Sequence, residues 1–221
     1  MTRRLRIEWD HGQKVTARLT MPASAKETGI LLAHGAGAGQ DHPWMVAMRD
    51  LLANERFPTM TFNYAYIEAG RRAPDRAPKL LAVHRAAADR LASYTRWVVL
   101  AGKSMGGRVA SHLVGDEGWP ARALAYLGYP LVPVGKTVPR AIDHLHRIQV
   151  PHLFVSGTRD SLGPPHLISS LVAELPGASH LEITGGDHSL RVPKRASKST
   201  DEVLGDVAVA VGQWLDALPS K

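Results

Sequence analysis

Hydrophobic and polar residues alternate near the start of the chain. Apolar residues occupy every second position from 5 to 9 and again from 15 to 21, with the polar residues 11–14 between the two runs. A period of two is typical of strands that bury one face. The beginning of the chain therefore predicts an antiparallel hairpin at one edge of a β-sheet.

From residue 29 onward, short apolar runs alternate with stretches of helical length. This alternation is typical of β-α-β units with right-handed crossovers. The sequence thus predicts an α/β fold, with a mostly parallel eight-stranded sheet, an N-terminal antiparallel hairpin and helices on both faces. The expected strands after the hairpin cover residues 29–34, 58–62, 97–101, 123–127, 152–156 and 180–184, and the expected helices cover residues 43–55, 79–93, 105–114, 141–147, 165–175 and 200–218.

The regular alternation is not interrupted by a repeat, a low-complexity tract or a linker, so we expect a single domain over residues 1–221. Residues 64–78 are the least regular stretch, and a rim that contacts substrate and a solvated connection explain them equally well. Residues 128–150 leave room for a loop and one short helix. We therefore expect no helical lid and a pocket that is open to solvent.

One serine lies where a strand is expected to turn sharply into a helix. The residues at 102–106, Gly-Lys-Ser-Met-Gly, directly follow the apolar run at 97–101. Such a turn strains its central residue and leaves no room for side chains at the flanking positions, which favours glycine there. A phosphate-binding loop would need a glycine five positions before Gly102, where Trp97 stands. The pattern and its context predict that Ser104 is a nucleophile.

A serine nucleophile needs a base, and the base needs an acid that orients it. Of the eleven histidines, His188 directly follows the last expected strand, within a Gly-Gly-Asp-His-Ser run. Asp160 follows another strand in a turn that contains glycine, which favours it over Asp116 and Asp187. The sequence therefore predicts a catalytic triad of Ser104, Asp160 and His188, in that order along the chain.

Acyl transfer also needs backbone N–H groups that hold the developing oxyanion. Met105 follows the serine and offers one, and the small residues at 34–39 form a loop from which Ala36 offers the other. A dinucleotide-binding fingerprint in this loop would need glycine at position 40 or 42, where Gln40 and His42 stand. We expect an oxyanion hole made by Ala36 and Met105.

With these motifs in this order, the chain resembles a small, lidless member of the α/β-hydrolase superfamily over almost its full length. It is similar to the dienelactone-hydrolase-like group and to the testis-expressed and NSL-complex-subunit hydrolase-like group. Dienelactone hydrolases proper carry cysteine at the elbow, whereas this chain has Ser104 and no cysteine at all. The resemblance implies the α/β-hydrolase fold and a serine hydrolase.

Charge and composition narrow the range of partners. The net charge is +7, but the basic residues are spread along the chain apart from one cluster within residues 191–198. A solvated surface or a preference for anionic substrates explains this better than a nucleic-acid partner. The lack of cysteine excludes disulfides, residues 1–8 do not resemble a secretory signal, and no apolar run is long enough for a membrane span. We expect a cytoplasmic protein with neither a nucleic-acid nor a membrane partner, and the sequence indicates no oligomeric state.

These observations predict a serine hydrolase of the carboxylesterase or thioesterase type. Its substrate would be a small or soluble molecule with an ester, thioester or similar activated acyl bond, and the reaction would need no metal or organic cofactor. A non-catalytic protein-interaction module with the same fold is the alternative, and nucleic-acid association through the basic surface is a third hypothesis.

A few other residues have two interpretations. We expect Lys103 to be a surface or hydrogen-bonding side chain and His34 to orient the 34–39 loop. His42 and Trp44 suit a pocket wall and packing at a helix start equally well. Asp143, His144 and His146 lack further metal ligands nearby in the sequence, so we expect a solvated helix face there and no metal site.

Overall fold

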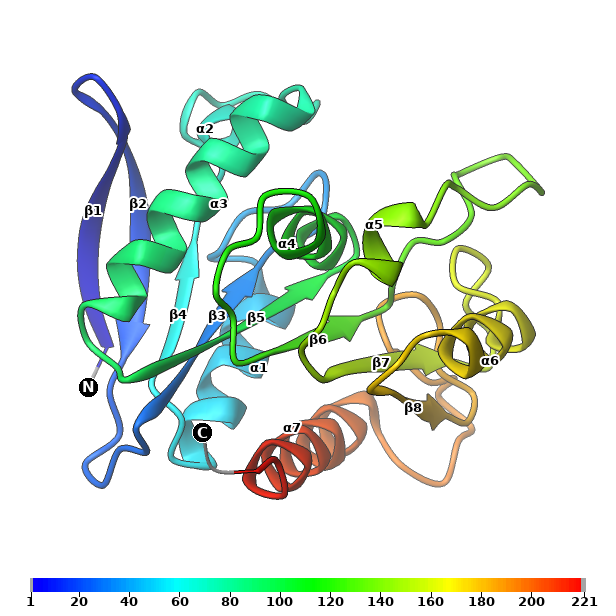
Figure 1. The fold of residues 1–221 in the computed structure, drawn as a ribbon. Coiled ribbons are helices and arrows are strands. Elements are labelled where there is room, and N and C mark those ends of the chain that lie inside the picture. Colours follow the sequence, from blue (N-terminus) through cyan, green and yellow to red (C-terminus); the bar gives the residue numbers. More distant parts are fainter. Residues whose placement is uncertain (1, 220–221) are drawn as a thin grey trace.

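In the computed structural model, eight strands form one sheet in the order β1-β2-β4-β3-β5-β6-β7-β8 (Figure 1). The structure describes residues 2–219, so the ends of the domain expected over residues 1–221 lie outside the described part. The strands are β1 (Thr2–Asp10), β2 (Gln13–Thr20), β3 (Thr28–Ala33), β4 (Thr59–Phe62), β5 (Trp97–Lys103), β6 (Ala123–Leu127), β7 (His152–Gly157) and β8 (Ala178–Ile183).

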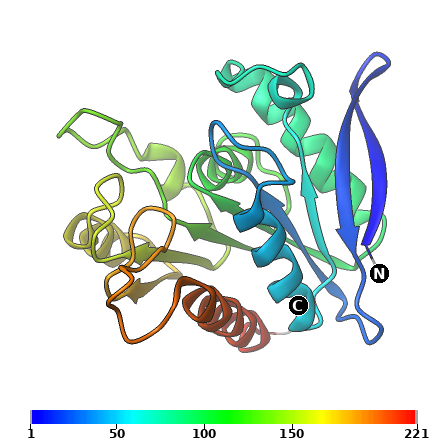
Figure 2. The same cartoon turned by 180° about the vertical axis from the view of Figure 1, so that it is seen from behind.

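Helices cover both faces of this sheet, as Figures 1 and 2 show from opposite sides. The helices α3, α4, α5 and α6 lie on one face, and α1 and α7 lie on the other. The bounds of the helices are α1 (Pro43–Asn54), α2 (Ala65–Glu68), α3 (Ala77–Ala92), α4 (Met105–Gly115), α5 (Asp143–His146), α6 (Pro165–Glu174) and α7 (Thr200–Asp216).

The N-terminal hairpin pairs as its alternating pattern predicts. β1 and β2 are antiparallel, with Leu5 opposite Ala17 and Ile7 opposite Val15. β2 is also antiparallel to β4, and all the remaining neighbours are parallel. This arrangement confirms the mostly parallel sheet with an antiparallel hairpin at its edge.

The central strands are buried on both faces, so their residues divide between two cores. Leu31 and Leu100 belong to the core under α3 and α4, whereas Ile30 and Val99 belong to the core under α1 and α7. In a parallel sheet covered on both sides, such strands appear as continuous apolar runs. The burial of both faces therefore explains why a continuous apolar run predicts each central strand.

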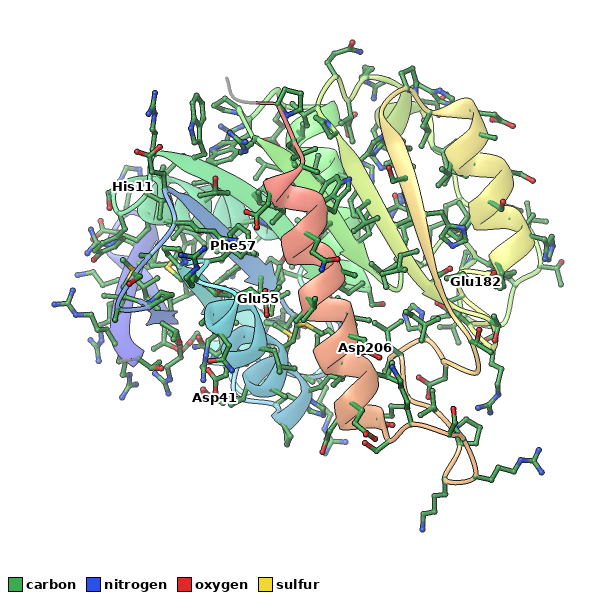
Figure 3. All side chains as sticks on the ribbon, turned by 90° about the horizontal axis from the view of Figure 1, so that it is seen from below. His11, Asp41, Glu55, Phe57, Glu182 and Asp206 are labelled. Atoms are coloured by element: carbon green, nitrogen blue, oxygen red, sulfur yellow. The ribbon has the colours of Figure 1, made fainter. Side chains whose placement is uncertain are left out.

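Figure 3 looks at the face that α1 and α7 cover. Glu55 and Phe57 lie between these two helices, and a Cβ atom at Gly212 of α7 would approach the Phe57 ring to 3.4 Å. The N-terminus of α7 is closed by a capping box, in which the Ser199 and Glu202 side chains bond each other's backbone N–H groups. Lys198 of the preceding loop pairs with Asp206 of the helix at 2.5 Å.

Several element bounds differ by a few residues from the expectation, and two segments differ for a reason that the structure shows. The stretch at 64–78, expected as a loop throughout, contains the one-turn helix α2, because Tyr64 and Tyr66 are drawn into the core and are both fully buried. The last strand runs over Ala178–Ile183 rather than residues 180–184, since its pairing with β7 begins at Ala178.

The segment between β6 and β7 carries only the short helix α5, so no helical lid covers the carboxyl ends of the strands. The expected open architecture is confirmed. Within residues 2–219, no helix combines the length and apolar character that crossing a membrane requires.

Candidate active site

Ser104 lies on the tight turn between β5 and α4. Its backbone has φ +50° and ψ −117°, a conformation that is strained for any residue with a side chain and costs about 1–3 kcal/mol. A Cβ atom at Gly106 would lie 2.5 Å from the carbonyl oxygen of Ala33, and one at Gly102 would collide with the backbone of Gly107. The turn therefore requires glycine on both sides of the serine, as the motif predicts.

The three side chains of the expected triad lie in hydrogen-bond contact. His188 Nε2 is 2.8 Å from Ser104 Oγ, and His188 Nδ1 is 2.9 Å from each carboxylate oxygen of Asp160. The Asp160 side chain is fully buried, and its Oδ1 accepts hydrogen bonds from the N–H groups of Leu162 and Gly163 at 2.8 and 3.0 Å. The structure thus brings together residues separated by up to 84 positions.

The loop that carries His188 is held close to the strand ends. A Cβ atom at Gly128, which follows β6 with φ +74°, would lie 2.6 Å from the carbonyl oxygen of His188. Glycine at this position therefore lets the histidine approach the sheet. On the other side, Trp44 Nε1 donates a hydrogen bond to the carbonyl oxygen of Ser189 at 2.8 Å. These contacts hold His188 from both sides.

The two rival acids have other partners. Asp187 Oδ1 accepts hydrogen bonds from the N–H groups of Ser189 and Arg191 and so shapes the turn after His188. Asp116 lies at the end of α4 and contacts Arg147 and, at 2.7 Å, His112 Nδ1. Neither carboxylate orients His188.

The loop expected to supply an oxyanion donor is held by a buried histidine. His34 Nδ1 lies 2.7 Å from the carbonyl oxygen of Gly35, and His34 Nε2 accepts a hydrogen bond from the N–H group of Tyr64 at 3.2 Å. Burial lowers the pKa of His34 to about 4, so the ring is neutral at pH 7. This confirms that His34 orients the loop.

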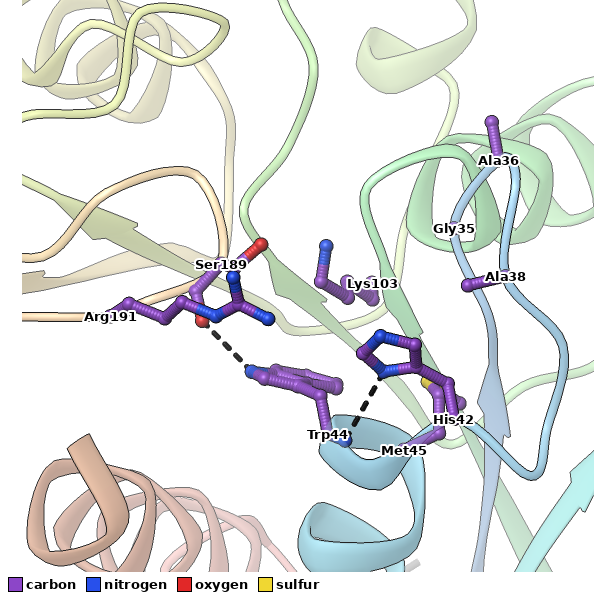
Figure 4. A pocket seen from close by; sticks show the side chains of 9 residues that line it. All are labelled: Gly35, Ala36, Ala38, His42, Trp44, Met45, Lys103, Ser189 and Arg191. Atoms are coloured by element: carbon purple, nitrogen blue, oxygen red, sulfur yellow. Dashed lines mark hydrogen bonds between the residues drawn. The ribbon is translucent and has the colours of Figure 1, made fainter.

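Two hollows border the loop at residues 34–39. The larger hollow, of about 330 Å³, is lined by Ser104, Ala36 and Met105 together with residues of α4 and of the segment after β6. The smaller hollow, of about 100 Å³, is lined by Ala36, His42, Trp44, Lys103 and other residues drawn in Figure 4. Ala36 thus borders both, and the two residues expected to form an oxyanion hole lie beside the serine.

The side chains that line the smaller hollow show the roles of His42, Trp44 and Lys103. His42 caps α1, since its Nδ1 accepts a hydrogen bond from the N–H group of Trp44 at 3.2 Å, and both side chains also line the hollow (Figure 4). Both of their expected roles are therefore correct. Lys103 Nζ lies 5.6 Å from the centre of the Trp44 ring, and burial lowers the pKa of Lys103. Lys103 is a wall residue and not a simple surface side chain.

His144 corrects another expectation. It is buried rather than on a solvated helix face, its ring stacks on His112 with centroids 3.7 Å apart, and its Nε2 lies 2.9 Å from Ser111 Oγ. Sequence spacing could not show this, because α5 packs against α4 through residues that are distant in the chain. Over the described part of the chain, the structure has no cluster of three or more His, Asp or Glu side chains that could hold a metal ion.

A family model described as the alpha/beta hydrolase domain matches residues 26–216. The chain belongs to this α/β hydrolase family. Family membership supports hydrolase activity in general. The match covers every element from β3 to α7, including the elbow and the loops that carry Asp160 and His188.

Solved structures share the fold of this α/β hydrolase at low sequence identity. A dienelactone hydrolase from Anabaena variabilis has 19% identity and a TM-score of 0.77, with 100% of this chain and 99% of that chain covered. A serine hydrolase without lid from Xanthomonas campestris has 15% identity and a TM-score of 0.76, covering 99% and 97%. Est1E from Butyrivibrio proteoclasticus has 17% identity and a TM-score of 0.75, covering 96% and 97%.

Sequence patterns did not single out two arginines that line the larger hollow. The sequence alone could have indicated Arg108, because it follows Ser104 by four positions at the start of a helix and therefore lies on the same face of that helix. Arg140 had no local signal, since it lies in the irregular segment between β6 and α5.

Proposed function

We propose that this α/β hydrolase cleaves an ester or thioester bond through a Ser104, His188 and Asp160 triad. The observation that supports this best is the continuous contact from Ser104 Oγ to His188 Nε2 and from His188 Nδ1 to the buried Asp160 carboxylate. Two other Ser–His contacts exist within residues 2–219, but among these only the Ser104–His188 contact has a carboxylate behind the ring and the serine on a strained turn.

In the proposed reaction, Ser104 Oγ attacks the carbonyl carbon while His188 Nε2 takes the hydroxyl proton. The N–H groups of Ala36 and Met105 would hold the oxyanion of the tetrahedral intermediate. His188 then gives its proton to the leaving alcohol or thiol, which leaves an acyl group on Ser104. Water, activated by the same histidine, attacks the acyl-enzyme and releases the acid. Asp160 remains ionised, orients the ring and stabilises the imidazolium.

The proposed substrate is small or soluble, because the hollows beside Ser104 are open and of modest volume, and no lid helix lies over them. The chemistry as written needs no metal or organic cofactor. A small acyl compound is therefore the expected partner of the site.

The test compares the parent protein with Ser104→Ala on short and long p-nitrophenyl esters and thioesters. We expect turnover to fall by roughly 10⁴-fold or more, since members of a triad act as a unit. Ser111→Ala is a matched control, because Ser111 also contacts a histidine and lies on the same helix.

A fluorophosphonate probe followed by mass spectrometry gives a second measure. We expect the probe to modify Ser104 in the parent and in Ser111→Ala. Hydrolysis by Ser104→Ala at the parental rate would refute the proposed mechanism. A folded parent that neither reacts with the probe nor cleaves any ester would instead support a non-catalytic interaction module.

A further inference from the structure

The larger hollow carries two positive charges beside the nucleophile. Arg108 lies on α4 one turn after Ser104, and its N–H group bonds the carbonyl oxygen of Ser104 at 3.1 Å. Arg140 lies near the end of the segment between β6 and α5, where its N–H group bonds the carbonyl oxygen of Leu131 at 2.8 Å. Both arginines line the same hollow as Ser104.

The positive charges of both guanidinium groups act on the buried Tyr129. Burial raises the pKa of Tyr129, whereas its hydrogen bond with Ser111 and the charges of Arg108 and Arg140 oppose that rise. Burial and then the charge of Arg108 lower the pKa of Arg140. Arginine nevertheless stays protonated in proteins. The two positive charges are thus near enough to repel each other.

No acidic side chain neutralises this pair. Within residues 2–219, no carboxylate lies within ion-pair distance of Arg108 or Arg140, and the buried Arg108 Nη1 has no hydrogen-bond partner at all. Arg140 Nε donates only to the carbonyl oxygen of Pro130, at 3.2 Å. Four arginines elsewhere do find carboxylates: Arg71 pairs with Asp75, Arg85 with Glu117, Arg96 with Glu27 and Arg147 with Asp116.

A buried donor without an acceptor is costly, and the two like charges repel each other, so an anion in the hollow would relieve both. Guanidinium groups bind carboxylates through paired hydrogen bonds with matching geometry. We propose that Arg108 and Arg140 bind a carboxylate that the substrate carries a few bonds from its scissile carbonyl. This inference rests on the proposed function, because it places that anion beside Ser104.

The carboxylate can belong to the acyl part or to the alcohol part, and two ester pairs distinguish these sources. The first pair is p-nitrophenyl hydrogen glutarate and p-nitrophenyl hexanoate, which differ in charge on the acyl side. The second pair is p-acetoxybenzoate and p-acetoxybenzamide, which differ in charge on the alcohol side. In the parent we expect kcat/KM for the anionic member of one pair to exceed that of its neutral partner by about tenfold or more, since hydrogen bonds to charged groups are strong.

Arg140→Gln is the first variant to test, because Arg140 is exposed and its replacement does not threaten folding. We expect it to lower the anionic-to-neutral ratio by about tenfold, mainly through KM, and we expect Arg108→Gln to do the same. Arg140→Lys keeps the charge but loses the fork of donors, so its ratio should fall between those of the parent and Arg140→Gln. Arg3→Gln is the control for net charge, because Arg3 is exposed on the edge strand β1.

The outcomes separate this inference from the proposed function. Ester hydrolysis that depends on Ser104 but shows a ratio near one for both pairs would overturn the anion site alone. Calorimetry of both ester pairs with Ser104→Ala tests the hollow without turnover. Tighter binding of the anionic member of one pair, lost in the double variants with Arg108→Gln or Arg140→Gln, would support the site. Equal binding within both pairs would overturn it, whether or not the parent is a hydrolase.

Discussion

Two serines of the same region each contact a histidine, yet their surroundings differ. Ser104 Oγ lies 2.8 Å from His188 Nε2, and Ser111 Oγ lies 2.9 Å from His144 Nε2. Ser111 sits within α4 and donates its hydrogen to the carbonyl oxygen of Arg108 in the same helix, at 2.7 Å. Its hydroxyl is buried, whereas Ser104 borders a hollow of about 330 Å³.

The histidines differ as well. Burial, followed by the charges of His112 and Arg108, lowers the pKa of His144 to about 3, so that ring cannot retain a proton at neutral pH. His188 instead has the Asp160 carboxylate 2.9 Å behind its ring, on the side away from Ser104. A Ser–His hydrogen bond alone does not make a general base. Room for a substrate and a carboxylate behind the ring are also needed.

The largest expected effect comes from replacing Asp160, the carboxylate beside His188, and Asp116 beside His112 is its comparison. Asp160→Asn should lower kcat by about 10⁴-fold, because an amide no longer favours the tautomer with Nε2 free to accept the serine proton. Asp116→Asn removes the partner of His112 and Arg147, and it should cost at most about 1 kcal/mol of stability with little change in kcat. Steady-state kinetics on a p-nitrophenyl ester would measure both. Equal losses of kcat in the two variants would refute the distinction between the Ser104–His188 contact and the Ser111–His144 contact.

The next largest effect is expected from an added methyl group at the contact between α4 and α5, beside His144. A Cβ atom at Gly115 would collide with the carbonyl group of His144, so Gly115→Ala should destabilise the fold by about 1–3 kcal/mol. Gly205 lies inside α7 with no atom within 4 Å of such a Cβ, so Gly205→Ala should stabilise by about 0.5–1 kcal/mol. Urea denaturation of both variants gives the two signs, and a stabilised Gly115→Ala would show that the contact is loose.

The buried His144 also predicts a dependence of stability on pH. Its folded pKa of about 3 lies below the value of about 6.5 expected for the unfolded chain, so the unfolded state binds the extra proton. The stabilisation is present above about pH 6.5 and is lost as the pH falls toward 3. The other fully buried histidines, His34, His84 and His152, have pKa values lowered to about 4, 3 and 4 by burial and act in the same direction.

Replacing one of these buried histidines should make the free energy of unfolding less dependent on pH. His144→Asn should lower the pH dependence of the unfolding free energy between pH 4 and 6 by about 1.4 kcal/mol per pH unit, the equivalent of one proton. Ser111→Ala keeps the buried ring, so it should shift the whole stability curve down and retain its steepness. Denaturation midpoints across this range would measure both, and an unchanged slope in His144→Asn would contradict the assignment.

The smallest expected effect concerns the tryptophan that holds the His188 loop. Trp44→Phe keeps an aromatic ring but loses the hydrogen bond to Ser189, worth about 1 kcal/mol, so kcat/KM should fall by about fivefold. Trp119→Phe loses a bond of the same length to Asp89 far from the triad, and it should affect stability alone. If both variants keep parental kcat/KM, the Trp44 contact does not position the base.

The sequence predicts most of this fold because its signals are local. Apolar runs mark the parallel strands, and alternation marks the hairpin. Gly102 and Gly106 mark the elbow, since only glycine leaves room between strand and helix. Asp160 and His188 could be found because each follows a strand end, and parallel strands deliver their carboxyl ends to one edge of the sheet.

The features that sequence could not predict depend on contacts between distant segments. His144 becomes buried because α5 packs against α4, and nothing in residues 141–147 indicates that neighbour. Arg140 reaches the hollow through an irregular segment, and Tyr66 makes a helical turn inside an expected loop. Periodicity carries no information about such placements, because they are fixed by packing rather than by local backbone preference.

The position of Ala36 affects how the site can evolve. Ala36 lies on the border between the two hollows, one lined by Trp44 and Lys103 and the other by Arg108 and Arg140. Substitutions on one side therefore leave the opposite wall, and the backbone shared between them, in place. A laboratory library confined to one side therefore has a defined target that is independent of the other side.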